Sequence, residues 1–547
     1  MSLRSREPLI FDRSVPGKVG LDLPKLDVPA AKDTRPAHLK RGSFDALPSC
    51  SEPDVIRHFT KLSLWNYGLD QGMYPLGSCT MKHNPRLNEK TAAIPGFAES
   101  HPMAPDAFVQ GNLALIHTLQ EWLKEITGLA AVTLQPSAGA AGELTGVMLI
   151  RAYHVSRGGK RRVILIPDSA HGTNPATAAM AGYDVVDVAS AADGTVSFED
   201  ITDAVTGRAK KGLLSVIAEH KEDIAGLMVT NPNTLGIFEH RIDEICKRIH
   251  EVGGLVYMDG ANMNALVGVA RPGDFGIDVM HMNLHKTMST PHGGGGPGAG
   301  PVLCTAALEP FLPKPVVVRD TVKVGEGEVP HHTYRWNWDR PQSIGKVHTY
   351  FGNFGMLVRA LTYCLSHGGD GLRDATLRAI VNANYIRKEL EGTYNLPIKT
   401  ATMHEVVFND AHQTKNDVTT LDIAKRLIDY GFHPPTIYFP TIVHGSLMIE
   451  PTESESKEEL DAFIHAMKTI AKEAQENPDL LHQAPVTAPL RRMDETTAAR
   501  KPVLRWAKTS GPWPAPKPPI ERLRNPFARS HSLCLKPRST SPGASPW

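Results

Sequence analysis

The sequence predicts an α/β protein, with a sheet of parallel strands in a large domain and a smaller α+β domain after it. From about residue 105 to about residue 305, short apolar segments alternate with segments of helical spacing, which is typical of a parallel α/β sheet. From about residue 345, longer helical stretches are followed by short strands, which favours a compact α+β lid.

These changes of pattern divide the 547 residues into four parts. Residues 1–104 are rich in Pro, Gly and charge without sustained periodicity, and they predict an extended arm that contains one unusual string, YPLGSCTMK at 74–82. The large domain then covers 105–344 and the small domain covers 345–510. Residues 511–547 hold nine prolines and six Lys or Arg against one Glu, so we expect a disordered tail.

Five short apolar segments flanked by turn residues are the predicted strands of the large sheet: 163–166, 185–188, 227–230, 255–258 and 279–284. Between the third and the fourth, Ile242, Ile245, Ile249 and Val252 recur at helical spacing, and Gly253 provides the stop. This segment predicts a β-α-β crossover between parallel strands.

The small domain has its own series of predicted elements. They are helices at 354–365 and 375–390, a strand at 405–408, a helix at 421–430, a strand at 446–450 and a last helix opened by the capping box of Ser456 and Glu459. We find no internal repeat.

Composition and charge argue against several classes of protein. The chain has 59 Lys and Arg against 58 Asp and Glu, and this net charge of +1 provides no field that would attract nucleic acid or an anionic membrane. The six cysteines are scattered without a CxxC pair, which argues against a zinc site or a disulfide framework. No segment is apolar enough for a signal peptide or a membrane span. We therefore expect a cytoplasmic protein that binds neither nucleic acid nor membrane.

The sequence HKT at 285–287 directly follows the last predicted strand. A lysine at the carboxyl end of a parallel strand points into the crevice where α/β proteins bind ligands, and partial desolvation there makes Lys286 a candidate nucleophile for an aldehyde. A lone lysine at a strand end is more often a surface residue. The motif therefore depends on its neighbours.

Asp259 supplies the first of these neighbours. The predicted strand 255–258 ends in Asp259-Gly260-Ala261-Asn262, which places a carboxylate at the same edge of the sheet. An isolated Asp in this position is more often a turn or cap residue. Pyridoxal phosphate (PLP) needs an anionic partner for its pyridine nitrogen, so Asp259 together with Lys286 predicts a PLP site.

Two further groups fit this site. The small residues Ser137, Ala138 and Gly139 lead into a helical run, so their amides can approach a phosphate, although a tight helix start explains them equally well. His171 follows the strand 163–166 and could stack on a pyridine ring or transfer a proton, although a lone His is more often structural. Asn231 follows the strand 227–230 and adds a polar group at the same edge.

Two other kinds of site fit less well. His281 and His285 are four residues apart, but HMNLH lacks the catalytic Glu of a zinc hydrolase and falls in a strand pattern, so we expect no metal. The glycine run 293–296 opens no clear helix and no ribose-binding acid follows it, which argues against a dinucleotide loop. These glycines instead favour a backbone that passes close to a cofactor.

From about residue 55 to 508 the chain resembles the P-protein family of the glycine cleavage system, in its two-chain form whose second subunit bears the cofactor. The strings that carry the resemblance include YPLGSCTMKHNPR (74–86), LQPSAGAAGE (134–143), PDSAHGTNPA (167–176), TNPNTLGIFE (230–239), MDGANMNA (258–265), NLHKTMSTPHGGGGPGAGP (283–301) and MIEPTESES (448–456). So many long strings in one order are specific to a family.

The resemblance implies a PLP enzyme of fold type I, like aspartate aminotransferase, that decarboxylates glycine and transfers the aminomethyl group to the lipoyl arm of the H-protein. It implies that Lys286 and His171 are catalytic, that no metal takes part, and that an alpha subunit completes an α2β2 assembly. The expected cofactor-binding residues are Lys286, Asp259, Ala261, His171, Ser137, Ala138, Gly139 and Asn231.

Other functions stay open at this point. An aminotransferase of the same fold normally needs an arginine clamp that we cannot identify, and a cysteine desulfurase needs a mobile loop cysteine, whereas Cys304 falls in an apolar, strand-like segment. A non-catalytic scaffold subunit with the same fold is a third alternative. The presence of both Lys286 and Asp259 argues against it.

Overall fold

The computed structural model describes residues 7–40, 42, 47–203, 207–292, 298–322 and 331–504. The predicted tail 511–547 and the glycine run 293–296 lie outside these described residues. No helix of the described part is long and apolar enough to cross a membrane.

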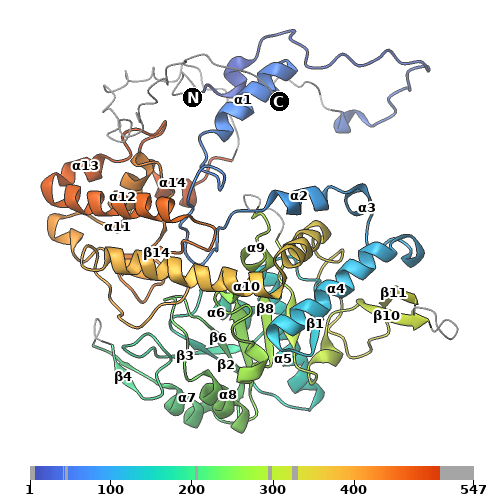
Figure 1. Cartoon of the computed structure of the whole chain (residues 1–547). Coiled ribbons are helices and arrows are strands. Elements are labelled where there is room, and N and C mark those ends of the chain that lie inside the picture. The colour runs from blue at the N-terminus through green and yellow to red at the C-terminus, as the bar shows by residue number, and fades with distance from the viewer. Residues whose placement is uncertain are drawn as a thin grey trace, which may run out of the picture.

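A seven-stranded mixed sheet forms the centre of the large domain (Figure 1). Its strands pair in the order β1 (Ala131–Thr133), β9 (Val302–Cys304), β8 (Val279–Met282), β7 (Leu255–Gly260), β6 (Ile224–Thr230), β2 (Val163–Pro167) and β3 (Asp184–Val188). Strand β9 is antiparallel to both of its neighbours, and the pairs among β8, β7, β6, β2 and β3 are parallel. All five predicted strands are therefore present in one sheet.

The predicted end of one strand is wrong. The segment 279–284 stops being a strand at Met282, and Leu284–Thr287 forms the one-turn helix α9. The amides of Lys286 and Thr287 bond to the carbonyl of Asn283 instead of to a neighbouring strand. On one side β7 ends at Gly260, which pairs with Met282. On the other side the amide of Leu284 still bonds to the carbonyl of Ala299, so the pairing ends first beside β7.

Helices cover both faces of the large sheet. Side chains along each strand alternate between the two faces, so each face packs into its own core. Leu165, Leu227 and Val256 pack into one core with α4 (Gln110–Thr127), α7 (Leu213–His220) and α8 (Ile242–Glu251). Ile164, Met228 and Tyr257 pack into the other with α5 (Gly139–Ser156) and α6 (Thr173–Met180). The predicted crossover helix is α8, whose Ile242, Ile245 and Ile249 are buried.

The long helix α10 (Phe354–Leu390) is broken at Gly368, which has φ +63° and ψ −177°. The break separates the two helices that the sequence predicts. The first part packs through Leu357 and Leu361 on the large core, whereas Ile386 and Leu390 belong to the small core. The domain boundary near residue 345 stays a prediction.

The small domain contains an antiparallel sheet in the order β12 (Val406–Asn409), β14 (Ser446–Ile449) and β13 (Thr436–Ile437). Helices α11 (Thr420–Asp429), α12 (Lys457–Glu476) and α13 (Pro478–Gln483) pack with it around a separate core. The predicted cap of α12 is present, since the Ser456 hydroxyl accepts the amide of Glu459 at 3.3 Å.

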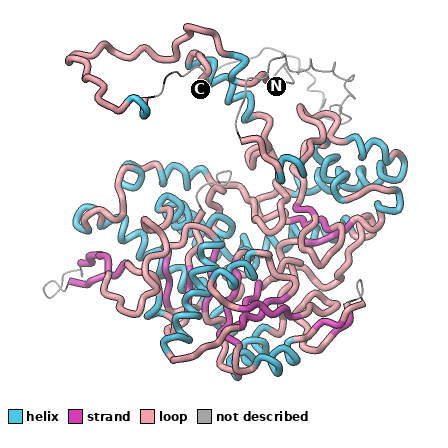
Figure 2. The backbone as a smooth tube through the Cα atoms, turned by 180° about the vertical axis from the view of Figure 1, so that it is seen from behind, coloured by secondary structure: helices cyan, strands magenta, loops and turns pink. Residues whose placement is uncertain are grey.

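The N-terminal segment extends away from the body before it returns (Figures 1 and 2). Most described side chains before about residue 50 are exposed, and α1 (Glu52–Ser63) follows. The chain then crosses the small domain, where Leu76 forms a bridge with Ile449 of β14. Helices α2 (Arg86–Ala92) and α3 (Pro95–Ala98) lie against α10.

The other elements are peripheral. They are the hairpin of β10 (Val316–Val322) and β11 (His331–Asn337), the short pair β4 (Ile201–Thr202) and β5 (Ala209–Lys210), and the helix α14 (Glu495–Arg500).

Candidate active site

The carboxyl ends of the parallel strands β2, β6, β7 and β8 lie at one edge of the large sheet. The predicted site residues His171, Asn231 and Lys286 follow three of these strands, and Asp259 lies near the end of β7. Polar groups from separate parts of the chain therefore meet at this edge, where open α/β sheets bind ligands.

Lys286 is half-buried in the one-turn helix α9, and its Nζ donates a 2.6 Å hydrogen bond to the carbonyl of Ser78 in the N-terminal arm. Its ammonium acts on several groups around it. Burial and, to a smaller extent, the charge of Lys286 lower the pKa of His292 to about 4. The amine thus lies in a partly desolvated, polar surrounding.

Asp259 is buried, with 3% of its surface exposed. Its Oδ1 accepts the amide of Ala261 at 2.9 Å and lies 3.5 Å from Nε2 of His281, and its Oδ2 accepts from Nδ2 of Asn174 at 3.4 Å. Such partners fix the position of a carboxylate. In this contact Ala261 contributes its backbone amide, which orients the Asp259 carboxylate.

The charges of Asp259 and Lys286 both affect the pKa of one imidazole, that of His171. Burial lowers the pKa of His171 most strongly, the Asp259 carboxylate opposes this, and the Lys286 ammonium lowers the pKa further. The same carboxylate and ammonium have opposite effects on His281, whose pKa burial lowers. The two charges are therefore both close to His171 and His281.

His171 is exposed on one side. Its Nδ1 accepts the amide of Thr173 at 3.2 Å and lies 2.8 Å from the Thr173 hydroxyl, and its ring meets the edge of Phe439 at 5.4 Å between centroids. The Thr173 hydroxyl also lies 2.8 Å from Oε1 of the buried Glu143. A continuous path of hydrogen-bonding groups thus connects Glu143 with His171.

Glu143 was not among the predicted site residues, although it ends the string SAGAAGE. Burial raises its pKa to about 7, and the negative charge of Asp259 contributes to the shift. Like charges disfavour ionisation of a second carboxyl. Glu143 therefore holds a proton more tightly than an ordinary glutamate.

Ser137, Ala138 and Gly139 form the loop that opens helix α5. Ala138 is the N-cap, and the first amides of a helix have no partner within it. A Cβ at Gly139 would lie 2.6 Å from Oδ1 of Asn283, so any larger residue would displace this side chain. The loop therefore presents free backbone donors at a helix N-terminus, as a phosphate requires.

Asn231 is fully buried, and its Oδ1 accepts the amide of Glu239 at 2.9 Å. This bond uses the side-chain oxygen for the turn that follows β6. Its Nδ2 has no partner among the described residues. Only this donor is left for a ligand.

Several buried polar atoms of the described residues lack a protein partner at this edge. They are Oδ1 of Asn174, Oγ1 of Thr230, Nδ2 of Asn231 and Oδ1 of Asn283. Such atoms are costly unless a ligand or water satisfies them. The groups beside these atoms are an amine, a carboxylate, an imidazole and a helix N-terminus. PLP binding needs these groups, so the residues fit this cofactor.

The arm string at 74–82 reaches this site, which the sequence did not indicate. Gly77 is required where it crosses β14, because a Cβ there would lie 2.2 Å from Cγ of Met448. Ser78 and Thr80 have φ of +63° and +44°, in the left-handed region. The string itself was the only signal of this contact.

A group of buried side chains lies beneath the same loop and was also missed. One ligand-type atom of each of His404, Glu405 and Glu450 lies within 4.8 Å of those of the other two. All three residues have none of their surface exposed. The dipeptide HE and the family string MIEPTESES are the only signals in the sequence.

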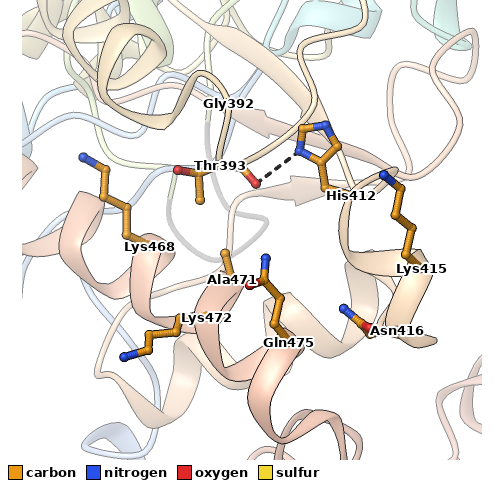
Figure 3. Close-up of a pocket in the computed structure, with 9 residues that line it drawn as sticks. All are labelled: Gly392, Thr393, His412, Lys415, Asn416, Lys468, Ala471, Lys472 and Gln475. Carbon is orange, nitrogen blue, oxygen red and sulfur yellow. Dashed lines mark hydrogen bonds between the residues drawn. The ribbon is translucent and has the colours of Figure 1, made fainter.

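A surface groove in the small domain is separate from these residues (Figure 3). Lys415, Lys468 and Lys472 are among its lining residues, and His412 Nδ1 bonds to the carbonyl of Thr393 at 3.4 Å. None of the predicted site residues lines this groove.

Solved structures with the same fold include several enzymes. Glutamate decarboxylase from Lactobacillus brevis is 12% identical, with a TM-score of 0.56 over 83% of this chain and 96% of that chain. A cysteine desulfurase from Escherichia coli is 14% identical, with a TM-score of 0.53 over 74% of this chain and 95% of that chain. A glycine decarboxylase (P-protein) of the glycine cleavage system, in inhibitor-bound form, is 18% identical, with a TM-score of 0.64 over 80% of this chain and 93% of that chain. At this identity the likeness concerns the fold alone.

The fold and the groups at its strand edge define a PLP-dependent enzyme of fold type I. The chain belongs to the glycine cleavage system P-protein family, whose model matches residues 26–324. A model of the glycine dehydrogenase C-terminal domain matches residues 375–486. The predicted family, fold class and cofactor are thereby confirmed.

Curated relatives agree over nearly their whole length. The probable glycine dehydrogenase (decarboxylating) subunit 2 of Caldanaerobacter subterraneus subsp. tengcongensis is 51% identical over 92% of this chain and 100% of its own length. The protein of the same name from Pyrococcus horikoshii is 52% identical over 91% of this chain and 96% of its own length.

Proposed function

We propose that this chain is the PLP-bearing subunit that decarboxylates glycine and transfers the remaining aminomethyl group to the lipoyl arm of the H-protein. The observation that carries the proposal is that Lys286 and Asp259 both lie close to His171 at the carboxyl edge of the sheet. Membership of the P-protein family supports the same activity.

Each predicted residue has one task at this site. The amine of Lys286 holds the cofactor aldehyde, and the carboxylate of Asp259 keeps a proton on the pyridine nitrogen. His171 would face the pyridine ring, and the amides of Ser137–Gly139 would hold the phosphate. Bound PLP supplies the electron withdrawal on which the decarboxylation depends.

The reaction balances with glycine and an oxidised lipoyl group. The bond between the glycine α-carbon and its carboxylate breaks, and CO2 leaves. The same carbon forms a bond to one sulfur as the lipoyl disulfide breaks, and the other sulfur takes up a proton as a thiol. When the nitrogen of Lys286 is free, the Ser78 carbonyl accepts its hydrogen bond and holds the amine in place.

The partner is subunit 1 of the same enzyme, in an α2β2 assembly. The name shared by the curated relatives, subunit 2, supports a partner chain. Leu21, Leu23 and Leu26 of the arm are 73%, 79% and 73% exposed. An exposed apolar segment of this kind fits a protein partner. We place the enzyme in the cytoplasm, where the free cysteines at 50, 79, 246, 304 and 364 would stay reduced.

The alternatives have less support from the site. Cys304 is fully buried in β9, and burial raises its pKa well above the ordinary value, so it does not resemble the mobile thiolate of a desulfurase. A scaffold subunit would have no need for Asp259 fixed by three partners beside Lys286.

The experiment that tests the function is glycine-dependent exchange of labelled CO2. The purified chain is mixed with PLP and lipoylated H-protein, with and without subunit 1. We expect exchange in the complete mixture and none with Lys286→Ala. A complete mixture without exchange would refute the assigned reaction.

A further inference from the structure

The arm loop Ser78–Thr80 is held over Lys286 by two acids of the small domain. The amide of Ser78 donates to Oε2 of Glu405 at 2.9 Å, and the amide of Thr80 donates to Oε2 of Glu450 at 3.1 Å. Both loop residues have left-handed φ, which costs of order 1 kcal/mol or more for a residue with a side chain. The two carboxyl groups therefore fix a backbone that would otherwise relax.

The remaining oxygens of these two acids have no ordinary donor. Oε1 of Glu405 and Oε1 of Glu450 are buried and unpartnered among the described residues. Both residues are fully buried, and each offers an atom within 4.8 Å of the other. Two buried carboxylates this close disfavour ionisation of both, and a proton on one of them removes the repulsion.

Other charged and titratable groups face the pair of Glu405 and Glu450. They are the ammonium groups of Lys286 on α9 and Lys82 on the arm, the thiol of Cys79 on the arm, and the imidazole of His404 next to Glu405. Burial raises the pKa of Glu450 to about 7 against the effect of the two lysines. Burial also lowers the pKa of His404 to about 3, so this imidazole stays neutral.

We propose that Glu405 and Glu450 share one proton and act as positioning residues, which hold the arm loop where the Ser78 carbonyl receives the amine of Lys286. The functional consequence depends on the role proposed for Lys286, but the shared proton does not. Both acids are far from the loop in sequence: Glu405 is 327 positions after Ser78, and Glu450 is 370 positions after Thr80. The packing of the small domain against the arm therefore assembles this support.

The sign of the pH dependence follows from the shared proton. A carboxyl with a raised pKa favours the folded loop at low pH, and this contribution is lost as pH rises through the raised value. In the folded loop Glu450 therefore loses its proton near pH 7, whereas the pKa of Glu405 is raised well above its usual range and the pair keeps one proton. Each unit of pKa shift corresponds to about a tenfold change in the opening equilibrium.

Hydrogen–deuterium exchange of the loop tests the proposal. The complex with subunit 1 and PLP is followed by mass spectrometry of peptides that cover 74–82, between pH 6 and pH 9. After correction for intrinsic exchange, we expect opening in the wild type to rise at least about tenfold. In Glu450→Gln it should stay constant, because the amide oxygen still accepts from Thr80 and the amide nitrogen replaces the shared proton.

Two further variants distinguish the effect of protonation at Glu450 from the effect of losing its hydrogen bond to the loop. Glu450→Ala removes the acceptor, and we expect fast exchange of the loop at every pH. Glu455→Gln is the matched control, since burial also raises the pKa of Glu455 to about 7 without any contact to the loop. This control should keep the pH response of the wild type.

Three outcomes would overturn the proposal. They are an unchanged pH response in Glu450→Gln, full protection in Glu450→Ala, or a stoichiometric metal in the wild type that elemental analysis no longer finds in Glu450→Gln. The exchange data do not depend on catalysis, so they separate this proposal from the assigned reaction. Glycine-dependent CO2 exchange, measured as a function of pH, then shows whether the activity of Glu450→Gln falls at a different alkaline pH from that of the wild type.

Discussion

Lys82 of the N-terminal arm and Glu453 of the small domain form a buried ion pair, with 2.6 Å between Nζ and Oε1. The same Nζ donates to Oδ1 of Asn264 in the large domain at 2.9 Å. Burial would lower the pKa of Lys82, but the Glu453 carboxylate outweighs it and raises the pKa. One side chain thus connects three parts of the chain that are distant in sequence.

We expect Lys82→Met to destabilise the protein by about 3 kcal/mol, because it leaves Glu453 buried without its cation. Urea unfolding of the variant measures the loss. The double variant Lys82→Met, Glu453→Gln should recover part of it, because no unpaired charge is left. A single variant as stable as the wild type would show that this pair does not hold the arm in place.

Lys286→Ala should abolish the absorbance band of the covalently held cofactor, because this band requires the bond between the cofactor aldehyde and the Lys286 amine. Absorbance of the purified complex with added PLP measures this. Lys221→Ala changes an exposed lysine as a control and should keep the band. A colourless wild type would contradict the assignment and favour the scaffold alternative.

Asp259→Asn should retain PLP and lose about 100-fold or more in glycine-dependent CO2 exchange. The amide still accepts from the backbone of Ala261, but it cannot hold a positive charge on the pyridine nitrogen. Absorbance measures retention of the cofactor separately from turnover. Full activity in this variant would refute the role of Asp259.

Glu143 should make stability depend on pH in the chain without PLP. Its folded pKa of about 7 is above the ordinary 4.5, so its contribution is complete below pH 4.5 and is lost as pH rises through about 7. We expect Glu143→Gln to remove a difference on the order of 2 kcal/mol between urea unfolding at pH 5 and at pH 8. Glu99→Gln, at an exposed position, is the control and should leave this difference unchanged.

The arm should bind subunit 1. Replacing Leu21, Leu23 and Leu26 together by serine should weaken association by about tenfold or more, because apolar anchors would be lost from the interface. Sedimentation of the mixed subunits measures this. Val503 and Leu504 are 91% and 87% exposed near the other end of the described chain, and their serine variants provide the control. Equal association of all variants would place the partner elsewhere.

The sequence by itself determined the parts of the structure that local pattern encodes. Apolar runs located the five strands, and the spacing of Ile242, Ile245 and Ile249 located a crossover helix. Lys286 and Asp259 could be placed at one edge because parallel strands bring their carboxyl ends together. The end of β8 at Met282 could not be predicted, because it depends on where the neighbouring strand stops.

Only the tertiary structure decided what surrounds Lys286. The carbonyl of Ser78 comes from 208 positions away, and the acids that fix its loop come from the small domain. No local pattern encodes such contacts, because they arise when the arm crosses β14 and buries Glu405 and Glu450 together. Burial sets the protonation of these acids, and burial is a property of the folded chain rather than of its sequence pattern.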